Sequence, residues 1–143
     1  MKDDPLPPND HISRWCGGSH IDPETGSIGP GAFMLKPKDI DGAVSVNWLE
    51  FLDPSDREIQ LRKVRAVFLS KRMKLGSKAK FAVLNVGEAI NNVKEETGAK
   101  IQPSILHSPK ELPGQWEDPS HSGIYGLPLD DDASAVALAD SVI

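Results

Sequence analysis

Residues 43–52, A-V-S-V-N-W-L-E-F-L, form the longest apolar-rich run in the first half of the chain and constrain its fold more than any other stretch. Val44 and Val46 alternate with Ser45 and Asn47, which is the period-two pattern of a strand with one buried face. β-branched residues also favour extended backbone. We therefore predict a strand whose valines face the core, whereas Ser45 and Asn47 share the opposite face.

Similar patterns predict the other strands, which are expected at residues 11–16, 32–35, 80–86, 100–107 and 122–125. A short loop with an Asp-Gly pair joins residues 32–35 to the stretch at 43–52, which favours a hairpin. The strand at residues 80–86 is apolar on both faces, as is typical of a central strand. Pro103 places the strand at residues 100–107 at the edge of a sheet. Residues 108–119 are expected to form a loop.

Three segments have helical patterns. Ser55 followed by Glu58 has the spacing of a capping box, so Ser55 is the predicted N-cap of the clearest helix. A shorter helix over residues 88–97 should end at Gly98. The last helix is expected over residues 130–143, with Val136, Ala139 and Ile143 on its inner face. These elements predict an α+β fold, a small mixed or mainly antiparallel sheet of about five strands with two or three helices packed on it.

Length and composition indicate one domain. The first ten residues contain three prolines and three aspartates, so residues 1–10 are expected to form a flexible arm outside the core. Residues 11–143 are long enough for a single domain with its own core. The lone Cys16 cannot form an intramolecular disulfide, which is typical of a reducing compartment.

Several classes of protein lack support in the sequence. The N-terminus has acids and prolines where a signal peptide has basic and apolar residues, and no window approaches the roughly 18 apolar residues of a membrane span. We therefore expect a cytoplasmic protein that does not contact a membrane. No phosphate-binding glycine motif or hydrolase elbow is present, and the four histidines lack the spacing of a local ligand pair. No cofactor and no metal are expected.

A basic segment covers residues 57–80, although the whole chain has a net charge of -5. It carries +8 against Glu58 as its lone acid, so the remainder carries -13. Its cations are Arg57, Arg62, Lys63, Arg65, Lys71, Arg72, Lys74, Lys78 and Lys80. Such a concentration of positive charge predicts docking on nucleic acid or on an acidic protein partner. The competing interpretation is a solvated helix face.

A second candidate site is polar and combines distant parts of the chain. His11 and Arg14 lie on the first predicted strand, and Asp118 and His121 belong to the turn D-P-S-H. An aspartate can fix the tautomer of a histidine that acts as a general base, and Ser45 would then position substrate. This arrangement predicts a small hydrolase or transferase, provided that all five residues line one pocket. Otherwise Asp118 caps its turn and His121 is a half-exposed surface residue.

The motifs H-x-x-R-W, G-A-F-M-L-K-P, S-V-N-W-L-E and D-P-S-H-S-G-I occur in this order over residues 11–125. This order is similar to small bacterial proteins of unknown function, from which no activity can be transferred. The early His/Arg strand and later Ser strand also resemble the layout of ADP-ribosyltransferase-like toxins. That resemblance implies a catalytic glutamate on a later strand, for which Glu88 and Glu111 are the acids available. Our leading prediction is a non-catalytic bacterial binding or accessory protein that uses its basic helix, with the enzyme as the alternative.

Overall fold

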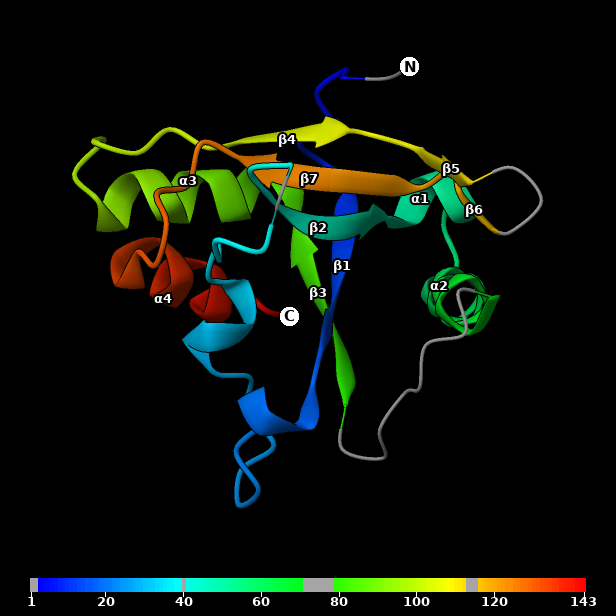
Figure 1. The fold of residues 1–143 in the computed structure, drawn as a ribbon, viewed down its shortest axis with the longest axis horizontal. Coiled ribbons are helices and arrows are strands. Elements are labelled where there is room, and N and C mark those ends of the chain that lie inside the picture. Colours follow the sequence, from blue (N-terminus) through cyan, green and yellow to red (C-terminus); the bar gives the residue numbers. More distant parts are fainter. Residues whose placement is uncertain (1–2, 40, 71–78, 113–115) are drawn as a thin grey trace.

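The computed structural model describes residues 3–39, 41–70, 79–112 and 116–143 (Figure 1). Within these ranges, five antiparallel strands form the main sheet, in the order β3-β1-β2-β7-β4. Their bounds are β1 His11–Cys16, β2 Ala43–Trp48, β3 Lys80–Asn85, β4 Ser104–His107 and β7 His121–Tyr125. A two-stranded sheet pairs β5 (Lys110–Leu112) with β6 (Trp116–Asp118).

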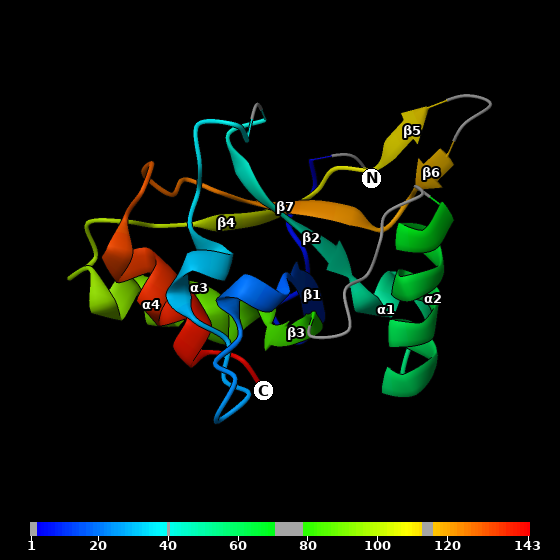
Figure 2. The same cartoon turned by 60° about the horizontal axis from the view of Figure 1, so that its bottom comes forward.

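The described helices lie in two groups. Their bounds are α1 Leu49–Leu52, α2 Arg57–Ser70, α3 Val86–Glu96 and α4 Asp132–Asp140, with short 3-10 helices η1 (Gly18–His20) and η2 (Pro30–Phe33). Both views of the ribbon place α3, α4 and η2 together, whereas α1, α2 and the β5–β6 hairpin occupy the other end of the molecule (Figures 1 and 2). The chain therefore has the predicted α+β fold.

The two faces of β2 confirm the alternation in its sequence. Val44 and Val46 are each 1% exposed and pack in the core, to which α3, α4 and η2 contribute Val93, Leu138 and Phe33. Ser45 is exposed and Asn47 is buried on the opposite face. The strand ends in α1, so the run without alternation is helical.

Two strand predictions were wrong in their pairing. The hairpin strand expected at residues 32–35 is not formed. Residues 30–33 form η2 instead, because Pro30 suits the first turn of a helix and Phe33 is completely buried there. The partners of β2 are β1 and β7. Strand β3 lies at an edge of the sheet. Its second apolar face is covered by a helix, since Phe81 contacts Phe68 of α2 with ring centroids 5.4 Å apart.

Other predictions need smaller corrections. The expected loop over residues 108–119 contains β5 and β6. Asp56 caps α2 in place of Ser55, because its Oδ1 accepts a hydrogen bond from the Ile59 amide at 3.2 Å. The inner face of α4 is also rotated from the prediction. Val136 and Ile143 are 36% and 74% exposed, whereas Ala135 and Leu138 are buried.

The N-terminal arm lies along the outer edge of β4. Pro5 forms an isolated bridge with Leu106, and the Leu6 amide donates to the Ile105 carbonyl at 3.0 Å. Leu6 is 5% exposed and belongs to the core. The expectation that residues 1–10 stay outside the core is therefore wrong for Leu6, which contributes an apolar side chain to it.

Candidate functional site

A groove of about 500 Å³ lies between α2 and the beginning of β3. We call it the basic groove, and its lining residues are Glu58, Leu61, Arg62, Arg65, Ala79, Lys80 and Phe81. The lining combines three cations with the apolar residues Leu61, Ala79 and Phe81. The groove therefore combines positive charge with apolar contact area, which is the combination that protein interfaces use for anchoring and specificity.

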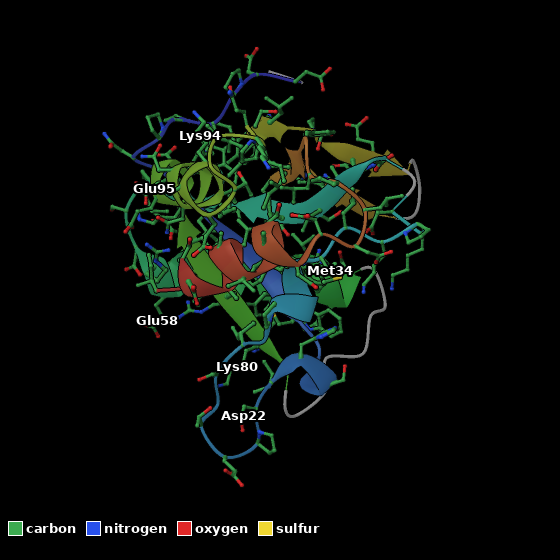
Figure 3. All side chains as sticks on the ribbon, turned by 90° about the vertical axis from the view of Figure 1, so that its left-hand side faces the viewer. Asp22, Met34, Glu58, Lys80, Lys94 and Glu95 are labelled. Carbon is green, nitrogen blue, oxygen red and sulfur yellow. The ribbon has the colours of Figure 1, made fainter. Side chains whose placement is uncertain are left out.

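The cations of the basic groove have different surroundings. The Arg65 guanidinium lies 5.6 Å from the centroid of the Phe81 ring, in cation–π range. Arg62 Nη2 is 3.6 Å from Glu58 Oε1, but both side chains are largely exposed and such a pair contributes little. Lys80 Nζ donates to the Gly26 carbonyl at 2.9 Å, and Figure 3 shows Lys80 beside the loop that carries Asp22.

The structure accounts for part of the predicted basic segment. Arg62, Lys63, Arg65 and Lys80 are exposed and Arg57 is half-buried. Lys63 points away from the groove, because its Nζ donates to the Leu52 carbonyl in α1 at 2.8 Å. The remaining four predicted cations lie outside the described residues: Lys71, Arg72, Lys74 and Lys78.

The second candidate site contains a buried polar cluster on the face of the sheet opposite α3 and α4. Asn47 Nδ2 donates to Asp118 Oδ1 at 2.9 Å and to Ser120 Oγ at 2.9 Å. The Ser120 hydroxyl donates in turn to Asp118 Oδ1 at 3.1 Å. The Asp118 carboxyl is completely buried. This cluster joins β2 to the last residue of β6 and to the turn after it, and its buried polar atoms are paired with one another.

His121 lies next to this cluster, because it pairs with Asn47 across β2 and β7. The side chain is 9% exposed, so the half-exposed interpretation was wrong. Its Nδ1 is 2.8 Å from the Ser108 carbonyl oxygen. Because a carbonyl oxygen only accepts hydrogen bonds, Nδ1 is the donor in this contact. Ser45 is two residues along β2 on the same face, and its side chain is exposed.

His11 and Arg14 have other partners. His11 Nδ1 is 2.7 Å from Glu50 Oε2, and the His11 amide donates to the other oxygen of the same carboxyl at 2.6 Å. Arg14 lies on the core face of β1, where Nε donates to the Ala32 carbonyl and Nη1 to the Ser45 carbonyl. Burial lowers the pKa of the Arg14 guanidinium.

The five proposed catalytic residues are thus divided. Ser45 and His121 lie on one face of the sheet, where Asp118 bonds Asn47, the neighbour of both. In contrast, His11 binds α1, and Arg14 holds η2 against β2 from the opposite face. Arg14 therefore cannot stabilise negative charge at a site that contains the Ser45 hydroxyl. The two acids considered for the toxin resemblance also lie off the main sheet, Glu88 on α3 and Glu111 on β5.

Sequence reasoning missed part of each candidate site. Phe81 and Leu61 line the basic groove, a role that the sequence patterns do not predict. Ser108 was assigned to a loop, and it is the partner of His121. No local signal reveals either role, because both depend on segments that are distant in sequence. In contrast, the alternation in β2 predicts that Asn47 and Ser45 share one face of the strand.

Other chemistry has less support among the described residues. Burial raises the pKa of the Cys16 thiol, which disfavours the nucleophilic thiolate. In the described ranges, no group of His, Cys, Asp and Glu side chains is arranged to hold a metal ion. The described helices also include none with the length and apolar character needed to span a bilayer.

Comparisons with protein-family models, curated proteins and solved structures found no match for this chain. The resemblances noted in the sequence motifs therefore stay predictions. The basic groove and the buried polar cluster are the two candidate sites of this chain.

Proposed function

We propose that this chain is a non-catalytic binding protein that docks an acidic protein partner in the basic groove. The observation that carries the proposal is that Arg62, Arg65 and Lys80 line one groove together with apolar side chains. Carboxylates of a partner would pair with the cations, and apolar side chains would cover Leu61 and Phe81. A bacterial accessory role and a cytoplasmic location are parts of the same proposal.

An acidic protein suits the groove better than nucleic acid does. Stacking on bases needs an exposed aromatic face, and the Phe81 ring is already in contact with Phe68 and Arg65. The chain outside residues 57–80 carries -13, so a long polyanion that extended beyond the groove would meet repulsion. A protein partner can confine its acidic residues to the groove.

The test measures binding to defined probes by fluorescence anisotropy. The probes are labelled polyglutamate, duplex DNA and single-stranded RNA, each at several salt concentrations. We expect polyglutamate to bind and its affinity to fall as salt rises, because exposed charges are screened. The double variant Arg62→Glu/Arg65→Glu should weaken that binding by about tenfold.

The matched control is Lys38→Glu/Lys100→Glu, which changes net charge equally at two exposed positions outside the groove. The control should bind polyglutamate as the unchanged protein does. Equal losses for the two double variants would contradict the proposal, as would a lack of polyglutamate binding. Tighter binding to DNA or RNA, with a log–log salt slope near about -5 for about six phosphate contacts, would favour a nucleic-acid partner instead.

A further inference from the structure

Strand β3 has one free edge. A single hydrogen bond shows which of its residues direct their N–H and carbonyl groups toward that edge. The Val83 carbonyl accepts a hydrogen bond from the Ile143 amide at 2.8 Å, so Val83 directs its backbone groups away from β1. Residues two apart in an antiparallel strand direct these groups to the same side. Phe81 therefore also presents its N–H and carbonyl outward, and neither has a hydrogen-bond partner among the described residues.

Two grooves flank this free edge. The basic groove lies on the α2 side, and a second groove of about 490 Å³ lies on the side of the C-terminus. Ile28, Pro30 and Val142 supply apolar surface to the second groove, and Asp140 supplies a negative charge. Because Lys80 and Phe81 line both grooves, the two grooves meet at the edge of β3.

The two grooves match the alternation of an added strand. Successive side chains of a strand point to opposite faces of the sheet. One set would enter the basic groove, where acidic side chains meet Arg62 and Arg65. The other set would enter the second groove, where Asp140 repels acids and Ile28 and Val142 favour apolar side chains. Lys80 lies beside Asp140 in the second groove, so the surplus of positive charge is at Arg62 and Arg65. The acidic side chains of an added strand are therefore expected to face the basic groove.

We propose that the free edge of β3 at Phe81 binds an extended segment of the acidic partner by strand addition, with acidic and apolar side chains alternating between the two grooves. This inference rests on the proposed function and specifies its mode of recognition. Backbone hydrogen bonds at Phe81 provide affinity, and the two grooves provide specificity. Ile143 limits the site at Val83, because its amide already occupies that carbonyl.

The probe is a labelled peptide of about eight residues that alternates Glu and Val, a usual length for a strand. In a paired strand, amides of only one residue type face β3, because hydrogen-bonding direction alternates along the strand. Two methylated versions are compared, one N-methylated on every Glu and the other on every Val. We expect one version to bind about tenfold more weakly than the other, since methylation removes the donors that face β3.

Amide hydrogen exchange supplies a second measurement on the whole chain. Saturating peptide should slow exchange at the Phe81 amide by about tenfold, since that amide gains a hydrogen bond. Equal binding by the two methylated peptides, or unchanged exchange at Phe81, would overturn strand addition. Polyglutamate binding that still depends on Arg62 and Arg65 would then leave the proposed function intact. Loss of both results would overturn both proposals.

Discussion

Ser45 and Asn47 occupy equivalent positions in the alternation of β2 but have different environments. Ser45 is exposed, whereas Asn47 is 3% exposed and donates to the buried carboxyl of Asp118. The difference arises because Asp118 and Ser120, at the end of β6 and in the turn after it, lie against Asn47. A buried carboxyl depends on its hydrogen-bond donors, so Asn47 has a structural role that Ser45 lacks.

Replacing Asn47 with Ala should lower the free energy of unfolding by about 1–3 kcal/mol, because the Asp118 carboxyl loses its amide donor without gaining water. Urea unfolding at neutral pH measures the change. Ser45→Ala is the matched control on the same face, and it should change stability by less than about 0.5 kcal/mol. Similar effects at the two positions would show that the polar cluster is not buried as described.

The ends of the helices show how closely local sequence patterns predict helix boundaries. Gly98 follows α3 with φ of 60°, as the sequence predicts. The helix begins at Val86, two residues before the predicted start, and Asn85 caps it by accepting from the Glu88 amide at 2.9 Å. The start of α2 was placed one residue early, because Ser55 and Asp56 are adjacent and both are good caps. Local chemistry therefore locates a helix end closely, and the exact residue depends on the preceding turn.

Asp131 provides a pH-dependent test of capping in α4. Its Oδ2 accepts from the Ser134 hydroxyl at 2.6 Å and from the Ser134 amide at 2.9 Å, and these bonds lower the pKa of Asp131 from its ordinary 3.8. A lowered carboxyl pKa stabilises the folded state above the pKa of the unfolded chain, and this contribution is lost as pH falls through the folded pKa.

We therefore expect Asp131→Ala to lower the free energy of unfolding by about 1 kcal/mol at neutral pH. The difference should shrink as pH falls below the ordinary carboxyl pKa of 3.8 and through the lowered folded pKa, because the unchanged protein then loses its charged cap as well. Urea unfolding at neutral pH and at a series of acid pH values measures it. Asp131→Asn keeps a capping oxygen that does not titrate, so its stability relative to Asp131→Ala should change less with pH. A difference for Asp131→Ala that is constant with pH would contradict the role of the carboxylate.

At the scale of the whole molecule, each end of the described chain covers an edge of the main sheet. Residues 4–6 bind the edge of β4, through the Leu6 amide and the Asp4 carbonyl, and the Ile143 amide binds β3. Uncovered edges favour unwanted pairing with other chains, so these contacts protect the sheet. The coverage of β3 stops at Val83, and the proposed strand-addition site begins beyond it.

The arm can be tested through Leu6, which is 5% exposed in the core. Leu6→Ala should lower the free energy of unfolding by about 2–4 kcal/mol, because it leaves a cavity beside the sheet. Pro7→Ala changes an exposed neighbour and should have an effect below about 0.5 kcal/mol. Thermal or urea unfolding measures both. Equal stability of the two variants would instead support the flexible arm expected from composition.

The sequence by itself determined the local features of this protein. The alternation at Val44 and Val46 identified a strand and its two faces, and Gly98 marked the end of α3, because backbone geometry imposes these periods within a few residues. The tertiary structure decided which strands pair, that β3 lies at an edge, and that Asn47 but not Ser45 is buried. It also brought Phe81 to Arg62 and Arg65. These features depend on contacts between distant segments, whose free energy comes from shared burial and leaves no signal in local sequence.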